Sequence, residues 1–223
     1  MVKSMFKKFS EWLFEQDALP IFVLICLTFA LTALIQQKYV LVDAVYYNSF
    51  GEQLADDRIE KMIEMRDEWA WLSYLLIPVI VVLQVFLITV CLNIGTILFN
   101  YRIGFIKLFR LVMKVQLLPT VVQLIVTLVA WQFLNIQTFD DLAKSNFYTI
   151  SALFNLSNIP KWLHYPLHTI NILEVAFCLV LAFGIRYALS LDYAKSLRFV
   201  GLTYGLGLLF WVTFMVFLQL NLS

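Results

Sequence analysis

The stretch WLSYLLIPVIVVLQVFLITVCLNIGTILFNY, residues 71–101, contains no charged residue, and it decides the fold class. About 20 apolar residues in a helix cross the hydrocarbon core of a bilayer, which is about 30 Å thick. The stretch exceeds one straight crossing, and tilt or an entry of its aromatic end from the aqueous edge absorbs the surplus. It therefore predicts a membrane-spanning helix.

The rest of the chain is also apolar. Of its 223 residues, 62% are hydrophobic and 16% are aromatic, which is more than a soluble domain can bury, so the excess must face lipid. Five stretches are long enough to span as helices, at about 18–37, 70–99, 115–135, 167–189 and 199–220. We predict an all-α, polytopic helical membrane protein. Its single five-helix domain covers residues 18–223, and interfacial amphipathic helices accompany it.

Lysine and arginine are divided unevenly between the two sides of the membrane. With the N-terminus inside, that side receives ten of the sixteen basic residues, and the other side receives six together with a large excess of acids. The positive-inside rule then predicts a cytoplasmic N-terminus and an external C-terminus in the plasma membrane, which is the inner membrane of a bacterium. The ten are Lys3, Lys7, Lys8, Arg102, Lys107, Arg110, Lys114, Arg186, Lys195 and Arg198.

Two segments on the predicted inner side are amphipathic. Residues 1–17 place aromatic side chains opposite lysines and predict a cytosolic interfacial helix, although a basic flank that merely sets orientation fits equally well. In YRIGFIKLFRLVMK, residues 101–114, the side chains of Lys107, Arg110 and Lys114 form a basic stripe. We expect this second segment to lie along the membrane surface, with its stripe facing anionic lipid or a protein partner.

An acidic segment precedes the second span on the predicted outer side. Residues 52–71 contain no Pro or Gly, and opposite charges such as Asp57 and Lys61 are spaced as neighbours on a helix. We expect an acidic outer helix that continues directly into the second span and projects from the membrane. A solvated charged face is favoured over a partner site or a cation site.

Glu174 is an acid inside the apolar run 162–185, where a carboxylate must be paired, protonated or hydrated. It precedes Arg186 by 12 positions, or roughly 18 Å of helix. If Arg186 marks the inner interface, Glu174 lies just past the midplane of the membrane. An ionisable residue at this depth is a candidate functional residue.

Other polar side chains occur at membrane depth. His168 and Asn171 precede Glu174 at spacings that place them near one face of the same predicted helix. Gln84 in the second span and Gln123 in the third span also need hydrogen-bond partners within the membrane. These five residues form the candidate intramembrane site.

Two roles fit Glu174. It can be a structural hydrogen-bonding group, bonded to Asn171 on its own helix or to Gln84 or Gln123 on other helices, and this role is favoured. Alternatively, desolvation favours its neutral form, from which it could exchange protons with the outer face through His168.

The sequence contains no recognisable catalytic motif. It lacks a nucleophile paired with a base, a phosphate-cradling loop and an HExxH motif. His164 and His168 are one helical turn apart, but Glu174 lies about 240° round the helix from His168, so one helix cannot close a zinc site. We expect no enzyme activity, no cofactor and no metal.

The fifth span contains a pattern of small residues. Gly201 and Gly205 are four positions apart, which permits close contact between helices. We expect this contact to lie within the chain rather than between two copies.

From about Arg102 to Leu220, about half of the chain, the order of features supports a family resemblance. The segments are FIKLFRLVMKVQLLP (105–119) and ISALFNLSNIPKWLHYPLHTINILEVAFCLVLAFGIRYALSLDYAKSLRFVGLTYGLGLLFW (150–211), which include the acid-bearing NILEVAF and the exit at Gly184 and Arg186. Their order resembles the Yip membrane-protein family, with Rab-interacting eukaryotic members and short bacterial relatives. The resemblance implies a five-helix membrane domain with a role in membrane organisation, trafficking or assembly. Rab binding is not implied, because only about 17 residues precede the first span.

Two functions of different classes fit these features. The favoured one is a non-enzymatic membrane protein that organises membrane or scaffolds a complex, through contacts with lipids and with protein partners or a second copy. The alternative is a small permease or the membrane subunit of a transporter, proton-coupled through Glu174. Five spans are few for a stand-alone carrier, and no inverted repeat is visible. No feature indicates nucleic-acid binding.

Overall fold

The computed structural model describes residues 17–145, 149, 159–169 and 171–222. The predicted amphipathic segment 1–17 lies outside the described residues, apart from Asp17. Within the described part, the regular elements are helices, and five are long and apolar enough to cross a membrane. They are Ala18–Val40, Asp56–Leu98, Phe105–Phe133, Ile172–Leu189 and Tyr193–Asn221. The predicted all-α, five-span fold class is confirmed.

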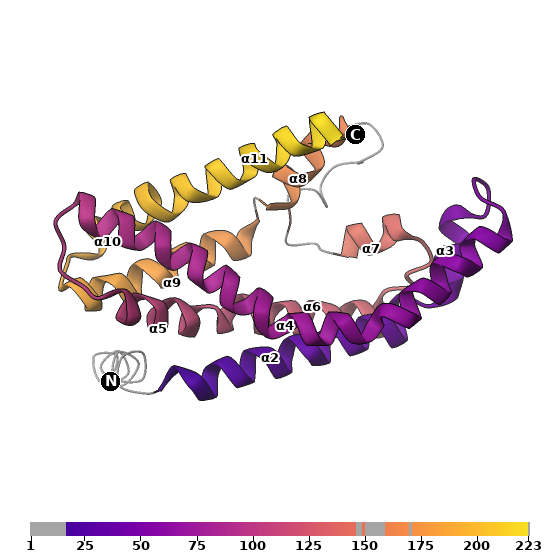
Figure 1. Cartoon of the computed structure of the whole chain (residues 1–223), viewed down its shortest axis with the longest axis horizontal. Coiled ribbons are helices and arrows are strands. Elements are labelled where there is room, and N and C mark those ends of the chain that lie inside the picture. Colours follow the sequence, from indigo (N-terminus) through magenta and orange to yellow (C-terminus); the bar gives the residue numbers. More distant parts are fainter. Residues whose placement is uncertain (1–16, 146–148, 150–158, 170, 223) are drawn as a thin grey trace.

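The helices form an elongated bundle (Figure 1). In chain order they are α2 (Ala18–Ile35), the π-helical turn η1 (Gln36–Val40), α3 (Asp43–Phe50), α4 (Asp56–Leu98), α5 (Phe105–Val115), α6 (Leu117–Phe133), α7 (Phe139–Ser145), α8 (Lys161–Thr169), α9 (Ile172–Leu189), α10 (Tyr193–Val200), the π-helical turn η4 (Gly201–Gly205) and α11 (Leu206–Leu222). The first turn of α2 and the last turn of α11 lie at opposite ends of the bundle, as five crossings require (Figure 1).

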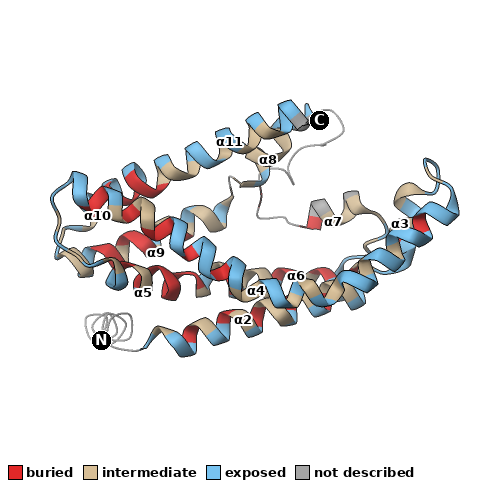
Figure 2. Ribbon diagram, in the orientation of Figure 1, coloured by how far each residue is buried: buried red, intermediate tan, exposed pale blue. Residues whose placement is uncertain are grey.

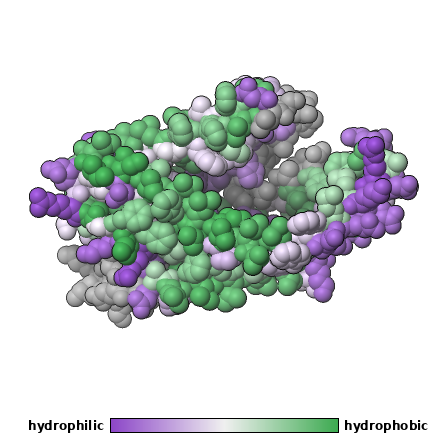
Figure 3. All heavy atoms as spheres, in the orientation of Figure 1, coloured by the Kyte–Doolittle hydropathy of each residue, from purple (hydrophilic) through white to green (hydrophobic). Residues whose placement is uncertain are grey.

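Hydrophilic residues gather at the two ends of the molecule, and hydrophobic residues cover the middle (Figure 3). One end holds the connections from α4 to α5 and from α9 to α10, with Arg102, Lys195 and Arg198, and is called the basic end. The other end holds α3 and the first turns of α4 and is called the acidic end (Figure 1). Exposed side chains such as Leu27 and Phe210 lie on the helices of the hydrophobic middle, which suits contact with lipid.

Helix α4 is a single helix of 43 residues. At about 1.5 Å per residue it is about 65 Å long, roughly twice the thickness of a hydrocarbon core. The acidic segment and the second span of the sequence prediction therefore belong to one continuous helix. Its acidic part extends beyond the hydrophobic middle and packs against α3.

One face of helix α5 is buried in the bundle (Figure 2). Leu108, Leu111 and Val112 have no exposed surface, and α5 contacts α2, α4 and α9. Protein therefore covers one face of this segment, and its position along the membrane surface stays a prediction. An amphipathic pattern shows that one face of a helix avoids water, but lipid and protein can cover that face equally well.

The predicted basic stripe is divided by this burial. Lys107 and Arg110 are exposed, whereas Lys114 is 3% exposed. The expectation that Lys114 faces lipid or a partner was therefore wrong, because its end of α5 continues into the core and then into α6 after Gln116. Lys107 and Arg110 remain a basic surface at the basic end.

Close helix contacts involve other glycines than those predicted. A Cβ atom added to Gly201 or Gly205 would meet no atom within 4 Å, so neither glycine is required for packing within the chain. A Cβ atom at Gly95 of α4 would lie 2.0 Å from Cγ2 of Thr203 in η4. Gly95 therefore lies where α4 and η4 approach closely, and the small-residue prediction for Gly201 and Gly205 was wrong.

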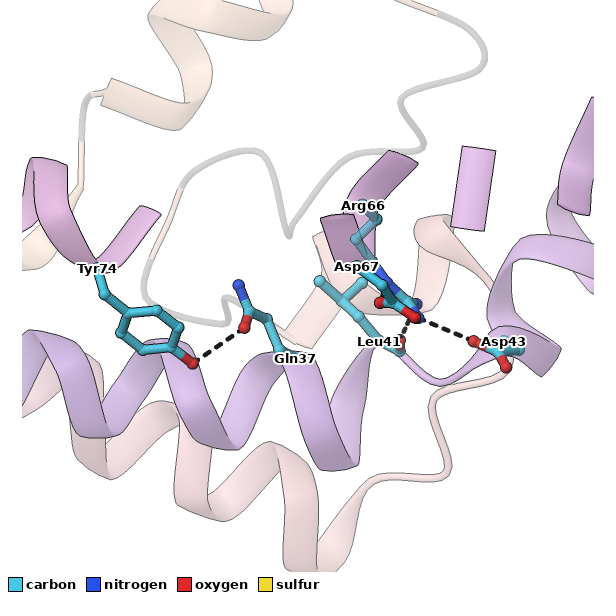
Figure 4. Close-up of polar contacts among 6 residues, drawn as sticks. All are labelled: Gln37, Leu41, Asp43, Arg66, Asp67 and Tyr74. Atoms are coloured by element: carbon cyan, nitrogen blue, oxygen red, sulfur yellow. Dashed lines mark hydrogen bonds and ion pairs between the residues drawn. The ribbon is translucent and has the colours of Figure 1, made fainter. Parts of the chain in front are cut away.

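Arg66 joins α4 to the segment after η1 at the acidic end (Figure 4). Its guanidinium group donates to the Leu41 carbonyl at 2.9 Å, to Asp43 at 3.0 Å and to Asp67 at 2.8 Å. The Tyr74 hydroxyl donates to Gln37 at 3.0 Å one layer closer to the hydrophobic middle. These bonds hold the projecting part of α4 against α3 and η1.

Candidate functional site

Glu174 lies in the first turn of α9, because the chain breaks its helical path just before this residue. Asn171 adopts an extended conformation, pairs with Thr149 in an isolated β-bridge, and caps α9. Its Oδ1 atom accepts a hydrogen bond from the Glu174 backbone N–H at 2.7 Å, as Asn does at many helix starts. The carboxyl group of Glu174 is thereby held at the start of a helix, where a negative charge is stabilised.

The predicted continuous helix through His164, His168, Asn171 and Glu174 was wrong. The two histidines lie on α8, which is a separate helix that ends at Thr169. The fourth span begins at Ile172 rather than near residue 167. Asn171 favours this break because its short polar side chain satisfies the first free N–H groups of a new helix.

Tyr204 is the partner of the Glu174 carboxyl group. Its hydroxyl donates a hydrogen bond to Oε1 of Glu174, and its ring packs against that of Phe177 at 5.6 Å between centroids. Tyr204 lies in η4, a single turn of π-helix. Such turns occur frequently at functional sites because the extra residue redirects nearby side chains.

A cavity of about 350 Å³ lies beside this pair, and is called the Glu174 cavity. Four membrane helices or turns supply its polar wall, namely α4, α6, α9 and η4. The lining residues are Phe29, Gln84, Ile88, Gln116, Pro119, Thr120, Gln123, Asn171, Leu173, Glu174, Phe177 and Tyr204. The cavity is open to the surface, where Gln84 at its edge is an exposed residue.

The chemistry of the wall favours a cation or a hydrogen-bond donor. Among the lining residues there is one acid, Glu174, and no Lys, Arg or His. Oε1 of Glu174 is occupied by Tyr204, whereas the side chains of Gln84 and Gln116 have no hydrogen-bond partner among the described residues. A small molecule in the cavity would therefore meet a carboxylate and amide groups with bonding capacity to spare.

Four of the five predicted site residues meet at this cavity. Gln84, Gln123, Asn171 and Glu174 come from three different helical segments and line one wall. His168 is exposed on α8 and does not line the cavity, so a proton path from Glu174 through His168 lacks the expected helical arrangement.

Sequence inspection missed Tyr204, Gln116 and Thr120. Membrane depth can be counted from the nearest arginine, which is Arg198 for Tyr204 and Arg186 for Glu174. This count places the two residues at different depths, because the two arginines lie at different distances from the turn that joins their helices. Counting from the turn itself, Ser190 to Asp192, places both residues about 12–16 positions along their helices, within reach of a Tyr side chain. Gln116 lies at the edge of the predicted third span, and the structure places it between α5 and α6, where it is 3% exposed.

Metal binding receives no support from the described residues. They contain no group of three or more His, Cys, Asp or Glu side chains that could hold an ion. In the described part, Cys26, Cys91 and Cys178 are free thiols within the spans. The chemistry of the site therefore rests on one carboxyl group, one phenol and the amides.

Comparison with protein-family models, with curated proteins and with solved structures finds no match to this chain. The resemblance to the Yip family stays a prediction.

Proposed function

We propose that this chain is a multi-pass membrane protein that binds a small cationic or donor-rich solute in the Glu174 cavity, as a permease or as the membrane subunit of a transporter. The observation that carries the proposal is the convergence of Glu174, Tyr204 and three glutamines on one open cavity within the hydrophobic part of the bundle.

The size of the cavity supports a role beyond structure. One hydrogen bond between Glu174 and Tyr204 would need no space around it, yet a volume of about 350 Å³ adjoins the pair. This volume is in the range of small-molecule sites in proteins, which are about 300–1,000 Å³. Buried polar groups without protein partners are costly in a membrane unless water or a ligand bonds to them. Gln116, which is 3% exposed and lines the cavity, is therefore suited to bind a solute, and the exposed Gln84 lies at the edge where a solute would enter.

Methylammonium is the probe for this proposal. We expect a saturating concentration to raise the Tm of the purified protein in detergent by about 2–4 °C, because a ligand that binds the folded state stabilises it. The Glu174→Gln variant keeps the shape of the side chain but loses the charge, and we expect methylammonium to leave the Tm of this variant unchanged. Thermal unfolding followed by tryptophan fluorescence measures both.

Two controls define the result. Glu60→Gln removes an exposed acid on the acidic part of α4, so this variant should keep the full response to methylammonium. Tetramethylammonium chloride at equal concentration supplies the charge without an N–H donor and should give a smaller rise. Equal rises in the wild-type protein and in Glu174→Gln would contradict the proposal.

A second function, assembly of a membrane complex, is favoured by the acidic part of α4. Met62 and Met65 are 39% and 63% exposed there, and they adjoin Trp69, which is 55% exposed. Met65 lies 33 positions before the end of α4 at Leu98, about 50 Å along the helix, which is beyond a single crossing of the hydrocarbon core. Large apolar side chains outside the lipid region suit contact with another protein.

Affinity purification in a mild detergent tests assembly. We expect the wild-type chain to recover partner proteins that Met65→Glu loses, because a charge in the centre of an apolar contact is costly to bury. Leu27→Ala, which alters a lipid-facing residue of α2, is the matched control and should recover the same partners as the wild type. Recovery of identical proteins by all three chains would count against a contact at Met65.

The orientation of the chain belongs to the same proposal. The basic end carries Arg102, Lys107, Arg110, Lys195 and Arg198. Placing this end in the cytoplasm agrees with the positive-inside rule and puts the acidic end outside a plasma membrane.

A further inference from the structure

A second cavity adjoins the Glu174 cavity on the side of the acidic end. Its volume is about 140 Å³, and residues of η1, α6 and α7 line it together with Leu41. The lining residues are Gln36, Val40, Leu41, Gln123, Val126, Thr127, Ala130, Leu142 and Ser145. Gln123 lines both cavities, so they share one wall residue.

Thr127 gives the second cavity its chemical character. This residue is 3% exposed, and its Oγ1 atom has no hydrogen-bond partner in the part of the chain that the structure describes. Thr120, two turns earlier on α6, instead donates to the Gln116 carbonyl at 2.8 Å. A buried hydroxyl without a protein partner is usually bonded to water or to a ligand. Here the space for that water lies beside it.

The wall that α7 contributes is held in place by α3. The Asn48 side chain donates to the Gln137 carbonyl at 3.2 Å, and the Phe139 backbone N–H donates to Ser49 Oγ at 2.9 Å. The rings of Tyr46 and Phe139 pack edge to face at 5.1 Å. These contacts fix the start of α7 over α6, so the second cavity is enclosed by anchored elements.

We propose that the second cavity is a hydrated vestibule, through which water and small cations reach Gln123 from the acidic end. Thr127 and Gln123 bind the water in it, and Gln123 passes the solute to the Glu174 cavity. The vestibule extends the proposed function by naming a route to the Glu174 cavity. The passage of a solute rests on the proposed function, whereas the presence of water in the vestibule does not.

Cysteine labelling tests directly whether water reaches position 127. Thr127→Cys is made in a chain whose three native cysteines are replaced by alanine, and its reaction with N-ethylmaleimide is timed in lipid nanodiscs. The thiolate is the reactive form, and it forms only in contact with water. We expect Thr127→Cys to react at least about ten-fold faster than Val121→Cys, which is 40% exposed on the same helix but lines neither cavity.

The comparison has two clear outcomes. Glu60→Cys, on the exposed part of α4, sets the rate of a fully accessible thiol. A Thr127→Cys rate between those of Glu60→Cys and Val121→Cys, and well above the latter, supports the vestibule. A rate equal to that of Val121→Cys overturns it.

Thr127→Val supplies a second measurement that needs no labelling. Valine keeps the shape of threonine but removes the hydroxyl group. If water bonds to that hydroxyl, the Tm of Thr127→Val should equal that of the wild type or fall, whereas a dry and unpaired hydroxyl predicts a rise in Tm. A rise in Tm would overturn the vestibule.

The two proposals can fail separately. If Thr127→Cys is labelled rapidly but methylammonium does not raise the Tm of the wild-type protein, the solute site is contradicted and the hydrated vestibule is still supported.

Discussion

Gly95→Ala is expected to lower the free energy of unfolding by about 3 kcal/mol, at the upper end of the cost of overpacking. The added Cβ atom would lie 2.0 Å from Cγ2 of Thr203 and 3.1 Å from the Phe199 ring, so η4 must move away from α4. This loss exceeds the gain of about 1 kcal/mol that Ala usually brings to a helix interior. Unfolding by sodium dodecyl sulfate in mixed micelles measures the difference.

Two variants isolate the cause. Thr203→Ser removes the methyl group that clashes but keeps the hydroxyl, which bonds to the Phe199 carbonyl at 2.8 Å. The double variant Gly95→Ala with Thr203→Ser should therefore regain part of the lost stability. Gly201→Ala, where a Cβ atom meets no neighbour within 4 Å, is the matched control and should not destabilise. Equal losses at Gly95 and Gly201 would contradict the close approach of α4 and η4.

Leu111→Ala is expected to cost about 2–5 kcal/mol of stability, because it leaves a cavity in the core. Leu111 has no exposed surface, and its Cγ and Cδ atoms lie 3.1–3.2 Å from the position that a Cβ atom of Gly184 would take. Ile106→Ala removes a side chain of similar size from the same helix at a site that is 68% exposed, so it should cost far less. The same micelle unfolding assay compares the two.

A double variant examines the contact between α5 and α9. Gly184→Ala alone should destabilise, since the buried Leu111 side chain has little room to give way. In Leu111→Ala, however, the new methyl group of Gly184→Ala fills part of the space, and the combined loss should be smaller than the sum of the single losses. Equal and small costs for Leu111→Ala and Ile106→Ala would contradict the burial of Leu111 between α5 and α9.

The spans were predictable because their cause is local. A charge-free run such as residues 71–101 must leave water whatever surrounds it, and its length alone indicates a crossing. The polar residues at membrane depth could also be identified from the sequence. Four of them share one cavity, namely Gln84, Gln123, Asn171 and Glu174. A polar group in a membrane has few alternatives to facing the interior of the bundle, which makes such residues converge.

The remaining features depend on which helices are neighbours. The pattern of α5 specifies a covered face but not whether lipid or protein covers it, so the burial of Lys114 could not be inferred. The partner of Glu174 is on another helix, and Tyr204 reaches it through a π-helical turn that no local pattern announced. The break at Asn171 was masked by apolar residues on both sides, although an Asn three positions before a Glu is a known start of a helix.

The continuity of α4 gives the molecule a mechanical property. The helix joins the acidic end to Gln84 and Gly95 without interruption, so it acts as a stiff lever arm. For an arm of about 65 Å, each degree of tilt moves the far tip by about 1 Å. Pro78, which removes one backbone hydrogen bond from the helix, lies between the acidic end and Gln84. A tilt of the projecting part that does not bend the helix at Pro78 therefore also displaces the wall of the Glu174 cavity.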